Sequence, residues 1–97
     1  MGETGAVLAR YTRRVSMADT DAAGIIYFAS PFRWAGDMFT DWLVEVGYPL
    51  SALFSEGLGT PVVSSRADYS SPLALDEVID LEMRASHIGD SSFALTV

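Results

Sequence analysis

Two aspartates stand one residue apart, directly before a glycine and a strongly apolar run. Residues 18–34 read ADTDAAGIIYFASPFRW, so that Asp19 and Asp21 precede Gly24 and the apolar stretch behind it. A carboxylate beside a carbonyl group can attack its carbon, or can activate a water molecule that does. Backbone N–H groups near 26–28, at the start of a helix, could polarise the carbonyl oxygen. One interpretation of the spacing is therefore a catalytic carboxylate at the rim of an apolar pocket.

Two other interpretations of the aspartate pair compete with catalysis. A plain turn fits equally well, because aspartate favours turns and Gly24 permits a backbone twist that other residues resist. A calcium loop does not fit, because an EF-hand counted from Asp19 requires an oxygen ligand at its fifth position and a glutamate at its twelfth. Those positions hold Ala23 and Ser30. The residues alone leave the turn and the catalytic carboxylate open.

A strand and a long helix must position these aspartates. Apolar and polar residues alternate from Val7 to Val15, which predicts a strand with one covered face. From Pro31 apolar residues recur every three or four positions, which predicts a helix over Ser30 to Val46, buried over more than half its circumference. Ser30 is the expected N-cap, Pro31 the first helical residue and Gly47 the stop.

The rest of the chain predicts a short helix and further strands. Pro49 to Glu56 is expected to be helical and Gly57 to Gly59 to form a loop. Three more segments are β-rich or alternate: Thr60 to Tyr69, Val78 to Ile88, and Ser91 to Val97 with Phe93, Leu95 and Val97 inward. Gly89-Asp90 supplies turn chemistry between the last two. A strand, a long buried helix and antiparallel strands predict one α+β domain over residues 1–97, with the sheet curved around the helix.

The composition excludes several classes of function. The formal net charge is −7 and all six basic residues are arginine, whereas nucleic-acid binding requires a basic stripe. The chain has no cysteine, so disulfides, thiolate metal sites and thiol nucleophiles are excluded. No window approaches the roughly 18 apolar residues of a membrane span, and the first residues do not resemble a signal peptide. We expect a soluble, cytoplasmic protein with no nucleic-acid or membrane partner.

The last residues carry a separate expectation. The sequence stops at Val97 inside a strand pattern, without a turn or a polar tail. Native domains seldom leave such an apolar strand edge uncovered. We therefore expect the domain to lack its last strands.

The segment Ala18 to Ser30, followed by Phe32-Arg-Trp34, resembles the signature of the 4-hydroxybenzoyl-CoA thioesterase family of hotdog-fold acyl-CoA hydrolases. The first motif is highly specific, and weaker agreement at Gly59 to Ser64 and at Ser92-Phe93 extends the similarity over nearly the whole chain. The resemblance implies a hotdog fold, in which a curved antiparallel sheet wraps a long central helix. It also implies an enzyme that hydrolyses an acyl- or aryl-CoA thioester to the free acid and CoA.

The resemblance assigns roles to individual residues. Asp21 matches the family's catalytic aspartate, which acts as a nucleophile through a mixed anhydride or as a general base for water. Phe28 matches the position whose backbone N–H polarises the thioester carbonyl; many relatives carry histidine there, but a main-chain role does not depend on the side chain. Tyr27 is a candidate for the acyl pocket, with core packing as the alternative, and Thr60 is a candidate substrate contact. Asp19 is expected to brace the turn.

The resemblance also sets expectations about cofactors and partners. The reaction uses water and implies no cofactor and no metal, and the acyl-CoA substrate is the expected ligand. Because hotdog relatives build each site between two subunits, a homodimer or homotetramer is expected. The opening Asp-Thr-Asp-Ala-Ala-Gly also occurs among 1,4-dihydroxy-2-naphthoyl-CoA hydrolases, which is compatible with an aromatic acyl group. The alternative is a non-catalytic hotdog module that binds acyl-CoA, against which the retained Asp21 counts.

One departure from the family pattern concerns the phosphates of CoA. Some relatives hold them with a basic cluster just before the Ser-Phe pair, where this sequence has Gly89-Asp-Ser91. Phosphate contacts are therefore expected to be weak or to come from other arginines, namely Arg66, Arg84, or the group Arg10, Arg13 and Arg14.

Overall fold

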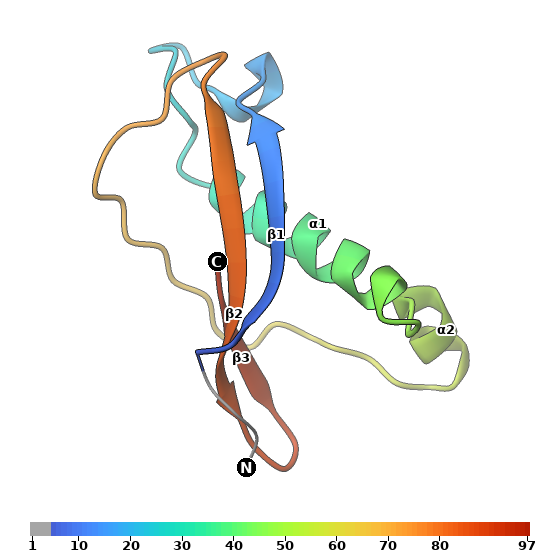
Figure 1. Ribbon diagram of the computed structural model, residues 1–97. Helices are drawn as coiled ribbons and strands as arrows, with labels where there is room; N and C mark the ends of the chain where they lie inside the picture. Colours follow the sequence, from blue (N-terminus) through green and yellow to red (C-terminus); the bar gives the residue numbers. More distant parts are fainter. Residues whose placement is uncertain (1–4) are drawn as a thin grey trace.

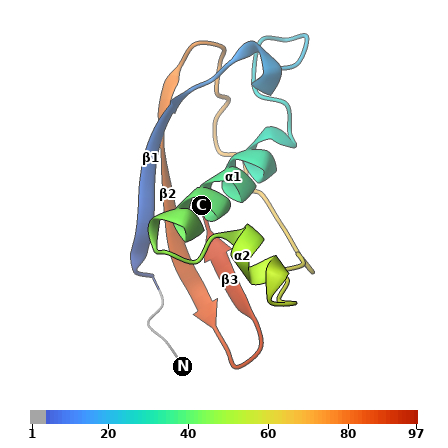
Figure 2. The same cartoon turned by 90° about the vertical axis from the view of Figure 1, so that its right-hand side faces the viewer.

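The computed structural model describes residues 5–97. Its helical and strand elements, in chain order, are β1 (Val7–Arg14), the short 3-10 turn η1 (Met17–Asp19), α1 (Ser30–Glu45), α2 (Leu50–Ser55), β2 (Val78–Ile88) and β3 (Phe93–Thr96). The strands form one antiparallel sheet in the order β1-β2-β3 (Figure 1). Seen from the side, α1 lies across one face of this sheet (Figure 2). The predicted α+β architecture, with a sheet packed on a long helix, is confirmed.

The strand pairing follows the predicted alternation. In the first ladder Val7 lies opposite Arg84 and Arg14 opposite Val78. In the second ladder β2 pairs with β3, and the Gly89 N–H donates to the carbonyl oxygen of Ser92 at 2.9 Å to close the connecting turn. The strands predicted at 7–15, 78–88 and 91–97 are therefore confirmed within one or two residues.

The two ends of α1 differ in how well the sequence predicts them. At the C-terminus Gly47 has a φ of +89°, and the N–H groups of Gly47 and Tyr48 bond to the carbonyl oxygens of Val44 (3.1 Å) and Leu43 (2.9 Å). This glycine-dependent arrangement is the predicted helix stop. At the N-terminus the prediction is wrong by one residue, because the cap position is Ala29 and Ser30 is already helical.

The burial of α1 is narrower than predicted. Its buried residues are Ser30, Trp34, Met38 and Leu43, whereas Val44 is mostly exposed. Trp34 and Met38 lie one helical turn apart and form the core with Val15, Met83 and Ala85 of the sheet side. A sheet of three strands covers only one side of a helix, so the predicted burial over more than half of its circumference is not observed.

The segment 60–69 corrects a second prediction. It was expected to be β-rich, but it contains no strand, and Val62 and Val63 are 81% and 92% exposed. Figure 1 shows it, in yellow and orange, within the long connection from α2 to β2. An extended backbone becomes a strand only when a neighbour accepts and donates its ladder hydrogen bonds. Within residues 5–97 no such neighbour lies beside this segment.

The last strand matches its predicted orientation in part. Phe93 and Leu95 line a cavity beneath α1, and the ring of Phe93 lies 5.9 Å from that of Phe39. Val97 is half exposed and does not line the cavity. Neither helix in the described part of the chain is both long and apolar enough to cross a membrane.

Candidate active site

Asp21 begins a tight turn between η1 and α1. Its N–H donates to the carbonyl oxygen of Ile25 (3.0 Å), and its own carbonyl oxygen accepts from Gly24 N–H (3.1 Å). One carboxylate oxygen, Oδ1, accepts a hydrogen bond from the N–H of Ala23 at 2.8 Å, which is the geometry of an Asx turn. Gly24 has a φ of +76°, so the glycine is required by the backbone. The turn interpretation is therefore correct, and the carboxylate it presents is exposed to solvent.

The start of α1 presents an available backbone donor. Tyr27 N–H donates to the carbonyl oxygen of Asp19 (2.8 Å), and Ser30 N–H donates to the carbonyl oxygen of Tyr27 (2.9 Å). Between them, the N–H of Phe28 has no acceptor within residues 5–97, while its carbonyl oxygen accepts from the hydroxyl of Tyr69. A free N–H at the positive end of a helix can bind a carbonyl oxygen that develops negative charge.

The side chains next to this donor form an exposed aromatic pair. The rings of Tyr27 and Phe28 lie 4.6 Å apart at a tilt of 52°, and Phe28 is 65% exposed. Neither ring belongs to the buried core. The packing interpretation of Tyr27 is thus not supported within this chain.

Asp19 is the buried member of the aspartate pair, with 0% of its surface exposed. Burial alone would raise the pKa of its carboxyl group. Hydrogen bonds from the backbone N–H of Ser16, the indole of Trp34 and the hydroxyl of Ser16, together with the charge of Arg13, instead lower the pKa to about 2. Asp19 is therefore ionised at neutral pH, and it is enclosed by donors rather than presented to solvent.

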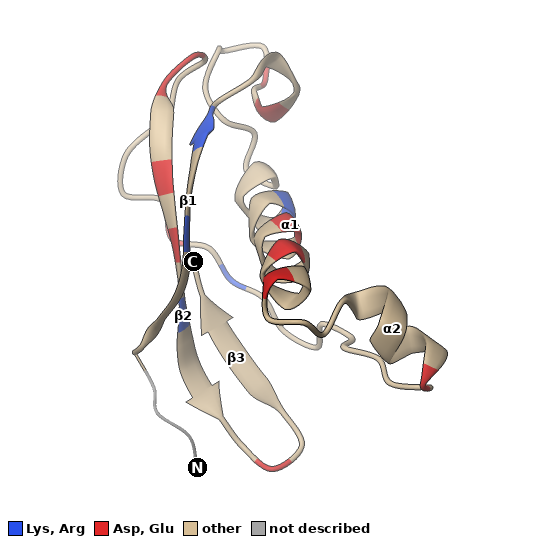
Figure 3. Ribbon diagram, turned by 45° about the vertical axis from the view of Figure 1, so that its right-hand side comes forward, with Lys and Arg blue, Asp and Glu red and all other residues tan. Residues whose placement is uncertain are grey.

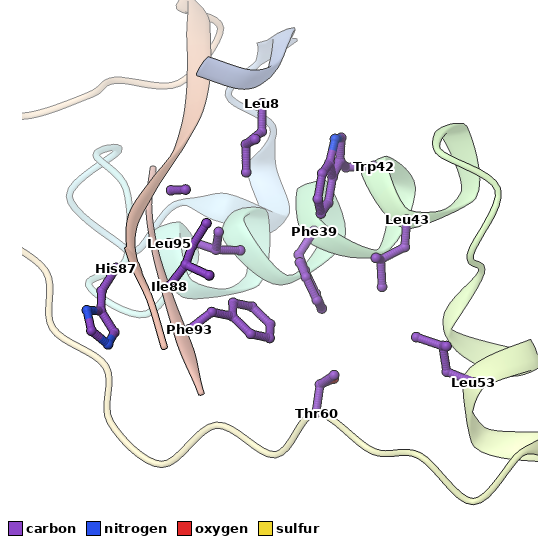
Figure 4. Close-up of a pocket in the computed structure, with 11 residues that line it drawn as sticks. Leu8, Phe39, Trp42, Leu43, Leu53, Thr60, His87, Ile88, Phe93 and Leu95 are labelled. Carbon is purple, nitrogen blue, oxygen red and sulfur yellow. The ribbon is translucent and has the colours of Figure 1, made fainter. Parts of the chain in front are cut away.

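The predicted site residues fall in two places. Asp21, Tyr27 and Phe28 share the loop 20–29. Thr60 instead borders an open pocket of about 340 Å³ that is lined by residues of α1, α2 and the sheet (Figure 4). None of the three loop residues lines that cavity, so a single chain does not bring Thr60 together with them.

A second cavity lies beside the turn that carries Asp21. Its volume is about 320 Å³, and it is lined by Ile25, Ile26, Tyr69, Ser70, Ser71 and Pro72. Tyr69 is a residue that sequence reasoning missed, because nothing in the local pattern of 60–72 indicates a contact with Phe28. Arg33 and Trp34 were quoted only as part of a matched motif, and their spacing of 14 and 15 residues from Asp19 gave no sign of a shared hydrogen-bond network.

The arginines expected to meet CoA phosphates have acidic or carbonyl partners. Arg10 and Arg84 both pair with Glu82 (2.9 and 2.5 Å), and Arg66 pairs with Asp68 (3.5 Å). Arg13 donates to the carboxylate of Asp19 (2.9 Å), and Arg14 donates to the backbone carbonyl oxygen of Asp76 (2.7 Å). Figure 3 shows acidic residues in red along the ribbon of α1, which the sequence identifies as Asp37, Asp41 and Glu45. Phosphate binding by any of these arginines would have to compete with an existing partner.

Comparison with known proteins identifies the family. Residues 15–97 match the model of the thioesterase-like superfamily. A 1,4-dihydroxy-2-naphthoyl-CoA hydrolase of Prochlorococcus marinus (strain NATL2A) is 32% identical over 91 residues, covering 86% of this chain and 59% of the relative. The chain spans about 60% of the length of the curated relatives it matches.

Solved structures agree with this assignment. A gentisyl-coenzyme A thioesterase superposes with a TM-score of 0.80 at 30% identity, covering 90% of this chain and 72% of that one. The 4-hydroxybenzoyl CoA thioesterase of Pseudomonas sp. strain CBS-3 has the same fold, and superposes with a TM-score of 0.77 at 24% identity over 90% of this chain and 65% of that one. The resemblance drawn from the aspartate motif is confirmed, and the chain belongs to the thioesterase-like superfamily with its hotdog fold.

Proposed function

We propose that the protein hydrolyses an acyl- or aroyl-CoA thioester to the free acid and CoA. One observation carries the proposal. The exposed carboxylate of Asp21, fixed in its turn, shares a single short loop with the Phe28 N–H, which has no acceptor within residues 5–97. A nucleophile or base and an oxyanion donor are the two groups that thioester cleavage requires, and here both lie on one loop. The names of the relatives support the same class of reaction.

The proposed chemistry needs no group beyond these two and water. The Phe28 N–H donates to the thioester oxygen, and the carbonyl carbon becomes more electrophilic. In one route an Asp21 oxygen bonds to that carbon, the C–S bond breaks, and CoA leaves as a thiolate. Water then opens the mixed anhydride and restores the carboxylate. In the other route Asp21 takes a proton from water, whose oxygen bonds to the carbon before the C–S bond breaks.

The loop also supports an aromatic acyl group as the substrate class. The relatives named above are a 1,4-dihydroxy-2-naphthoyl-CoA hydrolase and a gentisyl-coenzyme A thioesterase, and both names contain an aromatic acyl group. In this chain the exposed Tyr27 and Phe28 rings lie at the start of α1, where an aryl group bound near the Phe28 N–H could stack on them. We assign Tyr27 to the acyl pocket on this basis.

Thr60 and the oligomeric state belong to the same proposal. Since Thr60 lies apart from the loop 20–29 within one chain, it would reach the substrate from a second subunit of a homodimer or homotetramer, with each site at the interface. CoA thioesters are intracellular metabolites, so the proposal implies a cytoplasmic protein.

The proposal is tested by following CoA release with a thiol reagent. The substrates are a panel of aryl-CoA thioesters and short to medium acyl-CoA thioesters. Asp21→Asn preserves an oxygen that can accept from Ala23 N–H but removes the charge, so turnover should fall to background while binding persists. Asp37→Asn, on the exposed side of α1, is the matched control and should retain turnover. Substrate binding without hydrolysis by the unmodified protein would favour the acyl-CoA binding module instead.

A further inference from the structure

The carboxylate of Asp19 joins three separate elements. It accepts hydrogen bonds from β1, from the residue before η1, and from α1: Arg13 Nη2 (2.9 Å), Ser16 N (2.8 Å), Ser16 Oγ (2.9 Å), Trp34 Nε1 (3.0 Å) and Arg33 Nη2. Both oxygens are used, and the side chain has no exposed surface. Charge-assisted bonds of this kind are stronger than neutral ones, so the three elements are tied at a single point.

The backbone of the same residue joins the two ends of the loop 20–29. The carbonyl oxygen of Asp19 accepts from Tyr27 N–H at 2.8 Å and from the hydroxyl of Ser30 at 2.7 Å. The loop thus leaves Asp19 at Thr20 and returns to it before the helix begins. Asp21 lies two residues after this anchor, and Phe28 lies directly after Tyr27.

Two partly exposed arginines enclose the buried charge. The Arg13 and Arg33 side chains are 30% and 49% exposed, and the Arg13 guanidinium lies 4.9 Å from the centre of the Trp34 ring. Removing the charge of Asp19 would leave both guanidinium groups and the Trp34 N–H facing a weaker acceptor. Such groups relax toward solvent when their partner is lost, and they would carry the ends of the loop with them.

We propose that Asp19 is a positioning residue for hydrolysis, which fixes the Asp21 carboxylate and the Phe28 N–H relative to each other. The inference rests on the proposed function and deepens it, because Asp19 itself touches no reacting atom. Its carboxylate fixes the base of the loop on β1 and α1, and its carbonyl oxygen fixes the returning end. Since misplacement of reacting groups by about 1 Å can lower a rate by about a hundredfold, a loosened anchor should affect catalysis more than binding.

The test separates positioning from general stability. Asp19→Asn keeps the shape of the side chain and removes its charge. We expect kcat to fall at least tenfold with KM changed less than about threefold, in samples shown to be folded by circular dichroism. Hydrogen exchange of the Tyr27 amide should accelerate, while amides in the middle of β2 keep their rates. Thr12→Ala is the control. It removes an exposed hydrogen bond from Thr12, the neighbour of Arg13 in β1, to Asp80, and it should change neither kcat nor the exchange rate of the Tyr27 amide.

A second variant keeps the inference testable if Asp19→Asn does not fold. Ser30→Ala removes only the hydroxyl that reaches the Asp19 carbonyl oxygen. It should accelerate exchange of the Tyr27 amide and lower kcat by a few fold. The inference is overturned if folded Asp19→Asn, or else Ser30→Ala, keeps the parent's kcat and Tyr27 exchange rate. Failure of the proposed function would give a different result, namely full turnover by Asp21→Asn. In that case hydrogen exchange of the Tyr27 amide would still report whether Asp19 holds the loop.

Discussion

The hydroxyl of Tyr69 donates a hydrogen bond to the carbonyl oxygen of Phe28. The bond links the long connection before β2 to the residue whose N–H we assign to the thioester oxygen. The two residues are 41 positions apart in the chain, so this contact ties a distant segment to the start of α1. It also places the aromatic ring of Tyr69 in the wall of the cavity next to Ile25 and Ile26.

Replacing Tyr69 by Phe should lower kcat by a few fold. The change removes the hydroxyl and keeps the ring, so Phe28 loses the hydrogen bond on its carbonyl side, one peptide unit away from its N–H. The free energy of unfolding should fall by only about 1 kcal/mol, which is typical for one hydrogen bond. Steady-state kinetics and urea unfolding of the same preparation measure both effects. An unchanged kcat would show that the Tyr69 hydroxyl does not help to position the Phe28 backbone.

Stability should depend on pH through Asp19. Its pKa in the folded protein, about 2, lies below the ordinary value of 3.8, so the folded state binds this proton less tightly than the unfolded chain. The stabilisation is complete above about pH 4 and is lost as the pH falls toward about 2. Urea midpoints measured across this range should fall more steeply for the parent than for Asp19→Asn. Glu82, whose pKa is also lowered by hydrogen bonds from Arg10 and Arg84, is present in both proteins and cancels in the difference.

Gly24→Ala should impair the turn through the backbone alone. A Cβ atom at Gly24 would meet nothing within 4 Å, but its φ of +76° is unfavourable for alanine. We expect a loss of about 1 kcal/mol in unfolding free energy, together with reduced turnover because Asp21 begins the same turn.

Gly36→Ala provides the matched control for this glycine. Gly36 lies within α1, where a Cβ atom would also meet nothing within 4 Å and alanine is the better helix former. The substitution should therefore raise stability by about 0.5 to 1 kcal/mol and leave turnover unchanged. Equal effects of Gly24→Ala and Gly36→Ala on unfolding free energy and turnover would contradict the requirement for glycine at position 24.

Sequence reasoning succeeded where structure is determined by neighbours along the chain. Periodicity predicted β1 and α1, and Gly47 predicted the helix end, because each depends on residues within a few positions. It failed for 60–69, since strand formation depends on a partner strand that local sequence does not reveal. The predicted N-cap of α1 is wrong by one residue, because the hydroxyl of Ser30 donates to the Asp19 carbonyl oxygen instead of capping its own helix.

The candidate site divides in the same way. The motif proposes Asp21 and Phe28 as site residues, and this stays a prediction. The structure adds the Asx turn of Asp21 and the Phe28 N–H without an acceptor within residues 5–97, which the motif alone does not give. For Asp19 the sequence predicted only that it braces the turn, and it did not predict that the carboxylate is buried among donors. A buried carboxylate is satisfied by donors from β1 and α1, and folding alone brings these elements together.

The acidic side of α1 has a consequence for how a substrate would arrive. Asp37, Asp41 and Glu45 recur at intervals of four residues, on a chain whose formal net charge is −7. The proposed CoA thioester substrate is itself a polyanion, so it and the protein should repel each other at long range. Dissolved salt shortens the reach of that repulsion to about 10 Å at 0.1 M ionic strength. Encounter should therefore become faster as salt is added, and the substrate should approach from the side away from this helix surface.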